Sequence, residues 1–126
     1  MVQAPPNRQG HVQRHCLALD LKDDEALIAR YEAWHAPGAT PPAVIRSIRE
    51  ADILALEIWR LGTRLFMIME TGPRFSAEAK AAADMASDDV QAWERLMWRF
   101  QKPLPEAPEG EKWMALRRIF ALEEHS

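Results

Sequence analysis

Hydrophobic and polar residues change their spacing several times along the chain, and each change marks a predicted element. Residues 14–21 (RHCLALDL) alternate loosely, which predicts a first strand that ends at the turn-forming KDD of residues 22–24. The apolar residues that follow recur at helical spacing up to residue 35, which predicts a helix capped by an aspartate of that turn. A second helical stretch begins at Pro42, because proline is well tolerated in a first helical turn.

Two apolar runs typical of strands come next, and they cover residues 53–61 (ILALEIWRL) and 64–71 (RLFMIMET). The two residues between them, Gly62 and Thr63, form a connection of hairpin length. The second run is apolar almost throughout, as expected for a strand buried on both faces. The remaining pattern predicts a helix over 76–86, a helix over 90–101, a proline-rich loop over 102–111 and a final strand over 113–122.

This order of elements, β-α-β-β-α-β with each helical stretch split in two, is that of a ferredoxin-like α+β fold. Four strands with helices on one side leave the other face of the sheet uncovered. Because a second copy of the chain usually closes such a face, we expect a homodimer of the dimeric α/β-barrel type, formed by isologous packing. Residues 13–123 form the single predicted domain, and residues 1–12, which are polar and hold two prolines, form a predicted flexible extension.

The length and composition support one globular domain. The chain has 126 residues, 48% of them hydrophobic, and five tryptophans, which is enough for a core. Its net charge of −3 is spread over intermixed acidic and basic residues, so neither nucleic acid nor an anionic membrane is an expected partner. The longest apolar run, residues 65–69, is far shorter than the roughly 18–20 residues of a membrane span.

Cys16 is the only cysteine, so the chain can form neither an intrachain disulfide nor a thiolate metal cluster. The first residues of the sequence lack the apolar core of a signal peptide. The cytoplasm is therefore the expected compartment.

The main candidate for chemistry is His35, which follows Tyr31 by one helical turn in the stretch YEAWHAPGATPP. An imidazole with a pKa of about 6.5 suits proton transfer at neutral pH, and a tyrosine hydroxyl one turn away can orient it or a ligand hydroxyl. The prolines and glycine after His35 end the helix at the lip of a loop. The spacing fits an amphipathic edge of the core as well, so it leaves a structural role open. His11 and His125 lie near the termini, and His15 lies on the first strand, where a structural role is more common.

The five tryptophans are spread over several predicted elements, and most of them must serve the core or a dimer interface. Trp93 is followed by Glu94, and this pair suits a sugar: an indole face stacks on C–H groups while a carboxylate accepts from hydroxyls. The sequence has no glycine-rich phosphate loop, no dinucleotide fingerprint and no histidine pair at metal-ligand spacing. Neither a cofactor nor a metal is predicted.

Five stretches, taken in order, resemble the L-rhamnose mutarotase family over residues 14–122. They are RHCLALDL, Tyr31-x-x-x-His35, EIWRLGTRLFMIME, DVQAWERLMWRF and EGEKWMALRRIFAL. The resemblance implies a small dimeric ferredoxin-like enzyme that interconverts the α and β anomers of 6-deoxy sugars and needs no cofactor. It implies that His35 is the proton donor and that Tyr31 contacts the sugar. It further implies that Trp93 and Glu94 line the same pocket.

Three departures from the family pattern bear on the substrate. Glu94 stands where rhamnose-type members have a second tryptophan, and TPPA at residues 40–43 replaces their usual Trp-Pro-Glu segment. The aromatic residue that they carry on the second strand is replaced near Leu56, with Trp59 nearby as a candidate for a sugar contact. Glu94, together with the stretches IWRLG and WERLMW, makes the chain more similar to the branch associated with L-fucose and L-fuconate breakdown, and the other two departures indicate an altered pocket. The substrate that the resemblance implies is L-fucose or L-rhamnose.

The expected reaction is anomer exchange by His35-mediated general acid/base ring opening and closure. Two other functions stay open. Another cofactor-free enzyme of the dimeric α+β barrel type, such as a monooxygenase or a lactone isomerase, could use the same fold and a single histidine. A non-catalytic sugar-binding regulator would bind a 6-deoxy sugar without accelerating anomer exchange.

Overall fold

The structure is a computed structural model, and it describes residues 12–125. The predicted N-terminal extension lies outside this range except for residue 12, and so does His11. No α-helix in the described range is long and apolar enough to cross a membrane. The elements of this part of the chain are, in order, β1 (Gln13–Leu21), α1 (Glu25–Trp34), α2 (Pro42–Glu50), β2 (Ile53–Leu61), β3 (Arg64–Thr71), α3 (Ala77–Met85), α4 (Asp88–Trp98), β4 (Gln101–Lys102), β5 (Met114–Ala115) and the 3₁₀ turn η2 (Leu122–Glu124).

The sheet has the strand order β2-β3-β1-β4, and its described pairings are antiparallel. β2 and β3 form the predicted hairpin, and Gly62 turns it with a φ of 60°, a conformation that glycine adopts without steric cost. Helical segments separate β1 from β2 and β3 from β4. This arrangement confirms the predicted ferredoxin-like α+β fold.

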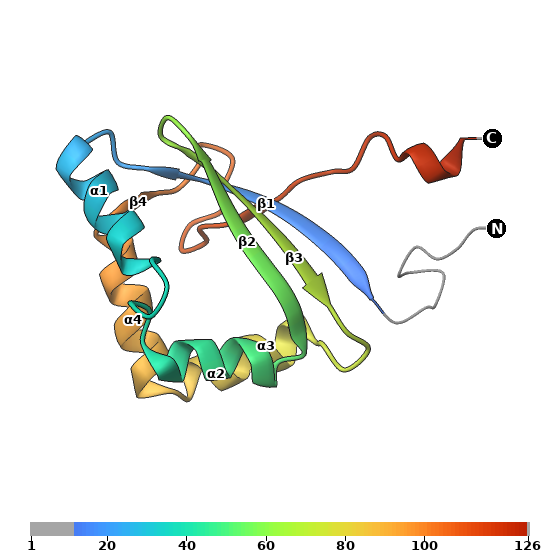
Figure 1. Ribbon diagram of the computed structural model, residues 1–126, viewed down its shortest axis with the longest axis horizontal. Helices are drawn as coiled ribbons and strands as arrows, with labels where there is room; N and C mark the ends of the chain where they lie inside the picture. Colours follow the sequence, from blue (N-terminus) through green and yellow to red (C-terminus); the bar gives the residue numbers. More distant parts are fainter. Residues whose placement is uncertain (1–11, 126) are drawn as a thin grey trace.

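The last strand is much shorter than the sequence pattern predicts. Instead of a strand over residues 113–122, only Met114 and Ala115 pair with β1, while β4 pairs with the end of β1 directly after α4. The Leu116 N–H still donates to the Cys16 carbonyl of β1 at 2.8 Å, and after Leu116 the chain leaves the sheet and extends past it (Figure 1). The prediction of a long final strand was wrong, because an apolar run does not specify how many of its residues find a pairing partner.

Local signals in the sequence start the helices. Asp24, Ser76 and Ser87 each cap a helix: the side-chain oxygen accepts from the backbone N–H three residues later, at 3.0, 3.1 and 3.2 Å. Pro42 occupies the first turn of α2, where its missing N–H leaves no helical hydrogen bond unmade. The predicted helical segments are all present, although the last one covers residues 88–98 and not 90–101.

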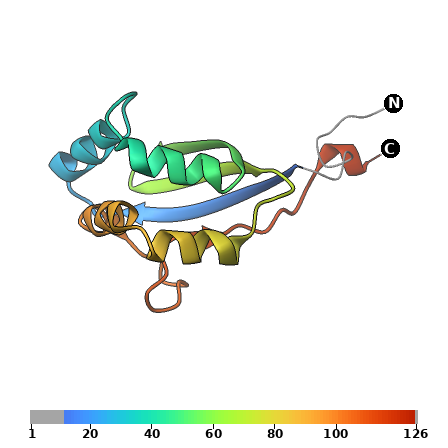
Figure 2. The same cartoon turned by 90° about the horizontal axis from the view of Figure 1, so that it is seen from below.

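The helices lie on one side of the sheet (Figure 1), and a view from below shows α2 and α3 running beside each other (Figure 2). A hydrophobic core fills the space between α1, α4 and the strands. Its central side chains, each at most 3% exposed, are Leu21, Tyr31, Leu65, Met97 and Phe100. The packing of these residues fixes α1 and α4 relative to β1 and β3.

The other face of the sheet is open in the single chain. Ala18, Phe66 and Trp59 lie opposite one another across β1, β3 and β2, so their side chains point to the same face. Trp59 is 60% exposed, and Leu61, two residues further along β2, is 77% exposed. Phe66, Ile68 and Glu70 point to this face and are only half-buried, although the run was predicted to be buried on both faces. The single chain therefore leaves apolar side chains of β2 exposed on this face.

Candidate active site

His35 stands where α1 ends, as the sequence predicts. The helix stops at Trp34, and the His35 backbone N–H still donates to the Glu32 carbonyl at 3.0 Å. The Thr40 hydroxyl donates to the Trp34 carbonyl at 2.9 Å, and Gly38 adopts a φ of 82° in the loop between them. The loop therefore folds back onto the end of the helix and fixes the backbone that carries the imidazole.

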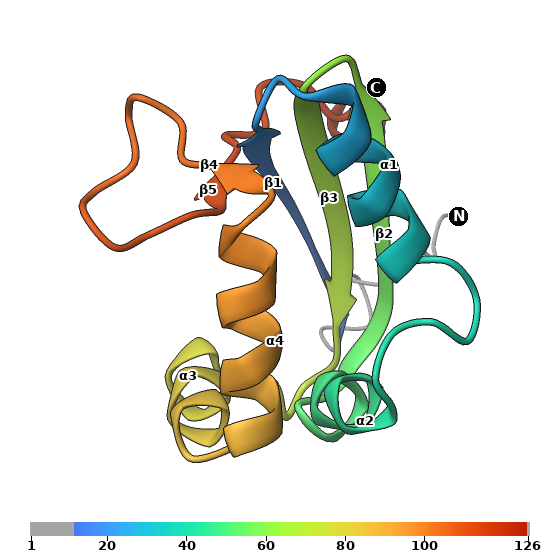
Figure 3. The same ribbon diagram turned by 90° about the vertical axis from the view of Figure 1, so that its left-hand side faces the viewer.

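Aromatic contacts gather three of the predicted site residues. The Tyr31 and His35 rings pack against each other with centroids 4.3 Å apart. Trp93 of α4 meets the imidazole edge-on, with 5.5 Å between centroids, and Trp34 meets Trp93 at 6.0 Å. Figure 3 shows α1 and α4 on the same side of the strands. These two helices thus bring Tyr31, His35 and Trp93 into one cluster above the sheet.

The hydrogen bond of the imidazole identifies its tautomer. His35 Nδ1 lies 2.6 Å from the Tyr31 carbonyl oxygen. A carbonyl oxygen can only accept, so Nδ1 carries the hydrogen and donates. In the neutral ring the lone pair is then on Nε2, which can accept a proton.

The surroundings of His35 favour the neutral imidazole. Burial lowers the pKa of His35 below its ordinary value of 6.5, and the hydrogen bond to the Tyr31 carbonyl opposes this shift only in part. The ring is therefore neutral at neutral pH. A neutral imidazole with a lone pair on Nε2 is a general base, and it becomes a general acid once it has taken up a proton.

The Tyr31 hydroxyl is held inside the protein. Tyr31 is 3% exposed, and Gln101 Nε2 donates to its phenol oxygen at 3.3 Å. Burial raises the pKa of Tyr31 to about 12; the Gln101 hydrogen bond lowers it and the nearby charge of Glu94 raises it, both by less than burial does. The phenol therefore keeps its proton at neutral pH and can donate a hydrogen bond.

A cavity of about 380 Å³ opens beside these two residues. A salt bridge lies at its edge, with Arg60 Nε 2.5 Å from Glu32 Oε2. The volume falls in the range of small-molecule sites, roughly 300–1,000 Å³. An imidazole, a phenol and a charged pair beside apolar walls can bind a small hydroxylated ligand and move a proton on it. The walls include Tyr31, Glu32, His35, Ile58, Arg60 and Leu65.

Glu94 follows Trp93 on α4 and is paired with a lysine from the C-terminal part of the chain. Lys112 Nζ lies 2.6 Å from Glu94 Oε1 and 5.0 Å from the ring centroid of Trp98. The side chain of Lys112 is 11% exposed and that of Glu94 is 41% exposed. Lys112 thus pairs with the carboxylate and leaves it partly exposed, and neither Trp93 nor Glu94 is among the residues that line the cavity beside His35.

Trp59 borders the cavity, but its indole belongs to the other face of the sheet. Its Nε1 donates to Glu57 Oε1 at 3.1 Å, and residues 57 and 59 share one face of β2. Arg60 points the opposite way and reaches Glu32 of α1. Trp59 and His35 therefore line the same cavity, although the Trp59 indole points to the sheet face away from α1.

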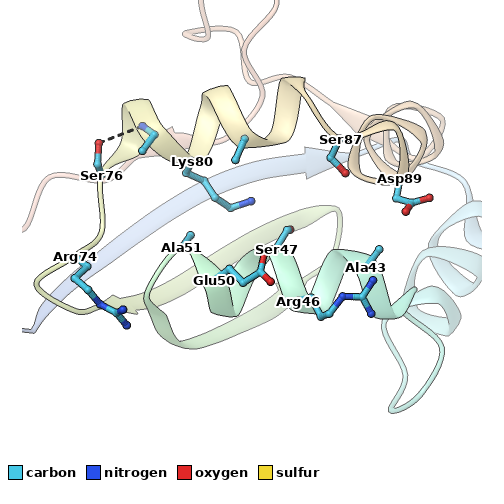
Figure 4. Close-up of a pocket in the computed structure, with 12 residues that line it drawn as sticks. Ala43, Arg46, Ser47, Glu50, Ala51, Arg74, Ser76, Lys80, Ser87 and Asp89 are labelled. Atoms are coloured by element: carbon cyan, nitrogen blue, oxygen red, sulfur yellow. Dashed lines mark hydrogen bonds between the residues drawn. The ribbon is translucent and has the colours of Figure 1, made fainter.

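A second cavity, of about 430 Å³, lies between α2 and α3 and has a different character (Figure 4). Figure 4 shows Lys80 reaching from α3 towards α2; its Nζ lies 2.5 Å from Asp84 Oδ1. Arg74, at the edge, pairs with Asp52 at 3.3 Å. The lining residues include no histidine, tyrosine or cysteine.

Within residues 12–125, moreover, no three His, Cys, Asp or Glu side chains are grouped to hold a metal ion. The smaller cavity beside His35 is the candidate active site.

Two residues close to the site were not identified from the sequence. Gln101 contacts Tyr31 across 70 positions of the chain, and Lys112 contacts Glu94 across 18. The predicted helix over 90–101 ends at Gln101, and Lys112 follows the predicted loop over 102–111. Their contacts depend on how β4 and the C-terminal segment return to the sheet, which no local pattern encodes.

Comparison with known proteins identifies the family. The family model described as L-rhamnose mutarotase matches residues 14–122. An L-fucose mutarotase of Xanthomonas campestris pv. campestris is 53% identical over 113 residues, which are 90% of each chain. A UPF0734 protein of Dictyostelium discoideum is 29% identical over 114 residues, 84% of this chain and 86% of that protein. The crystal structure of an L-rhamnose mutarotase from Formosa agariphila shares the fold, with a TM-score of 0.62 and 14% identity over 86% of this chain and 97% of that one. The chain therefore belongs to the L-rhamnose mutarotase family.

Proposed function

We propose that this protein is a sugar mutarotase that interconverts the α and β anomers of a 6-deoxy sugar, with L-fucose as the preferred substrate. The observation that carries the proposal is the half-buried neutral imidazole of His35, with its lone pair on Nε2, beside a cavity of sugar size. The preference for L-fucose is supported by the 53% identity with an L-fucose mutarotase. Glu94, which replaces the second tryptophan of rhamnose-type members, also supports a preference for L-fucose.

In the proposed reaction His35 acts first as a base and then as an acid. Nε2 accepts the proton of the anomeric hydroxyl, the bond from C1 to the ring oxygen breaks, and C1 becomes the aldehyde carbon. The imidazolium returns the proton to the ring oxygen, which becomes a hydroxyl. After the aldehyde group turns about its bond to C2, the reverse steps close the ring from the other face and restore the neutral imidazole. The protons and electron pairs balance without a cofactor.

The neighbouring residues hold the sugar. Tyr31 keeps its proton, because its pKa is raised to about 12, and donates to the oxygen on which negative charge develops. Trp93, whose ring lies 5.5 Å from the imidazole, provides an apolar wall for the C–H groups of the sugar. Glu94 accepts from a sugar hydroxyl at the accessible edge of the site.

A panel of 6-deoxy sugars separates this function from the alternatives. Magnetisation-transfer NMR measures anomer exchange, and the fluorescence of the tryptophans reports binding. Faster exchange of L-fucose than of L-rhamnose is the expected result. Binding of a 6-deoxy sugar without faster exchange would indicate a non-catalytic regulator. A protein that neither binds these sugars nor accelerates their exchange would instead be a candidate for aromatic or lactone chemistry.

The catalysed rate is expected to stay constant through neutral pH and to fall on acidification, with an apparent pKa below 6.5. The direction follows from the role of His35 as a base: protonation of Nε2 removes the lone pair, and burial places that protonation below the ordinary range of histidine. The exchange of L-fucose anomers is measured from about pH 4.5 to 8, a range that spans the ordinary histidine pKa. Spontaneous exchange is subtracted at each pH. An inflection above 6.5 would show that His35 is not the base as described.

We further propose that two copies of the chain pack through the open face of the sheet. Trp59 and Leu61 are exposed there, and Phe66 and Ile68 are half-buried beside them. The nearly continuous apolar sequence of β3 is typical of a strand that is covered on both faces. An isologous dimer would bury this surface on each copy.

Replacing Trp59 with aspartate is expected to convert the dimer into a monomer, because an unpaired carboxylate would be buried in the interface. Sedimentation velocity measures the change in mass. Met85→Asp is the matched control, since Met85 is also apolar and 73% exposed but lies on α3, away from this face. A Trp59→Asp protein that stays dimeric, or a wild-type protein that sediments as a monomer, would contradict the proposed interface.

The cytoplasm remains the proposed compartment. Cys16 is a free thiol that is half-buried on β1. A reducing compartment keeps such a thiol free, which supports this assignment.

A further inference from the structure

We propose that Gln101 is a positioning residue that fixes the direction of the Tyr31 hydroxyl. Its side-chain amide donates to the phenol oxygen, so that the phenol proton is left for the sugar. The inference rests on the proposed function and adds to it the residue that makes Tyr31 a donor to substrate.

Gln101 is held rigidly enough to do this. It is the first residue of β4, it pairs with Leu21 of β1, and it is 3% exposed. The Lys22 backbone N–H donates to the carbonyl of Phe100, the preceding residue, at 2.9 Å. Backbone contacts on both sides of the α4–β4 junction therefore set the position of the Gln101 amide. Figure 3 shows this junction, where α4 leads directly into β4 beside β1.

The hydrogen bond from the Gln101 amide to the Tyr31 phenol oxygen determines which hydrogen bond the phenol can still donate. Gln101 Nε2 lies 3.3 Å from the Tyr31 phenol oxygen. A phenol has a single proton, and an amide that donates to its oxygen leaves that proton for another acceptor. Since Tyr31 lines the cavity beside His35, that acceptor is an oxygen of the bound sugar. Without the amide, the phenol could rotate its proton away from the substrate.

The other polar atom of the Gln101 amide, Oε1, lowers the stability of the protein. Gln101 Oε1 is buried and has no hydrogen-bond partner among the described residues. An unpaired buried polar atom lowers stability, and such atoms are rare outside sites where function retains them. An apolar side chain of similar length would remove this atom. A polar residue that serves function at a cost to stability is a common feature of active sites.

Two variants test the proposal, and the single tyrosine of the chain makes a direct readout possible. The Raman Fermi doublet of tyrosine has a high intensity ratio when the phenol oxygen accepts a hydrogen bond and a low ratio when the hydroxyl donates a strong one. Gln101→Met removes the donor, so the ratio should depart from the wild-type value. Gln101→Glu provides only acceptor oxygens when ionised and draws the phenol proton to itself, so the ratio should fall.

Anomer exchange and thermal stability are measured on the same proteins. Gln101→Met should keep a Tm close to the wild-type value and lose about 100-fold in kcat with little change in KM, because misdirected catalytic groups cost about this much. Gln101→Glu should lose at least as much. An unchanged kcat in folded Gln101→Met protein, or a Raman ratio that does not move, overturns the proposal. A merely structural role predicts the opposite pattern, a lower Tm with an unchanged kcat. If the wild-type protein itself fails to exchange anomers, the proposed function fails instead, and the Raman ratio still reports whether Gln101 donates to Tyr31.

Discussion

Replacing His35 with asparagine is expected to slow the catalysed exchange of L-fucose anomers by about 10²–10⁴-fold, the usual contribution of a general acid or base. The asparagine amide can still donate to the Tyr31 carbonyl, which His35 Nδ1 contacts at 2.6 Å. It cannot accept a proton at neutral pH. The variant therefore removes the proton transfer and conserves the local hydrogen bond. Magnetisation-transfer NMR at saturating sugar measures the rate.

His15→Asn is the matched control for this experiment. His15 is also partly buried, and its Nε2 lies 3.0 Å from Thr71 Oγ1 on the neighbouring strand, outside the cavity lining. The His15 variant should keep a rate close to that of the wild-type protein. Equal rates in the two variants, both shown to be folded by circular dichroism, would remove His35 from the mechanism.

Replacing Phe100 with alanine is expected to lower the free energy of unfolding by about 3–5 kcal/mol, the range for a phenylalanine in a packed core. Phe100 is 1% exposed and meets the Tyr31 ring edge-on, with 6.0 Å between centroids. The Arg30 guanidinium lies over the Phe100 ring, with Cζ 5.5 Å from the ring centroid. The cavity left by the substitution would also loosen Tyr31. Urea unfolding measures the change in stability, and anomer exchange measures the consequence for the site.

Phe120→Ala is the control for the loss of an aromatic ring. Phe120 is 62% exposed in the C-terminal segment, and substitutions at exposed positions usually change stability by less than about 0.5 kcal/mol. A Phe100→Ala protein within about 1 kcal/mol of the wild type would contradict the assignment of Phe100 to the centre of the core.

The parts of the fold that the sequence predicts well are those with strong local signals. The bounds of β2 and β3 match the predicted runs, because a two-residue glycine turn separates two apolar segments and sets their register. The final strand shows what local signals do not determine. Residues 113–122 are apolar enough for a strand, yet only Met114 and Ala115 pair with β1. How long two segments stay paired depends on the path of the chain in space, and periodicity does not contain that path.

The same distinction holds for the candidate site. Tyr31 and His35 are one turn apart on α1, so helical geometry alone predicts that their rings meet, and the structure confirms the contact at 4.3 Å between centroids. The approach of Trp93 follows from the packing of α4 against the same core. Gln101 reaches Tyr31 only because β4 pairs with β1, and this pairing joins residues far apart in the chain. The residue that orients the phenol could therefore be found only in the folded structure.

The most direct test of the mutarotase proposal measures the exchange of L-fucose anomers at several concentrations of the wild-type protein. One anomeric proton signal is saturated, and the loss of intensity in the other gives the exchange rate. The excess of the exchange rate over the spontaneous rate should be proportional to the concentration of wild-type protein. The same concentrations of the His35→Asn protein should give only a small part of this excess. A rate that stays at the spontaneous value for every concentration of folded wild-type protein would contradict the proposed function.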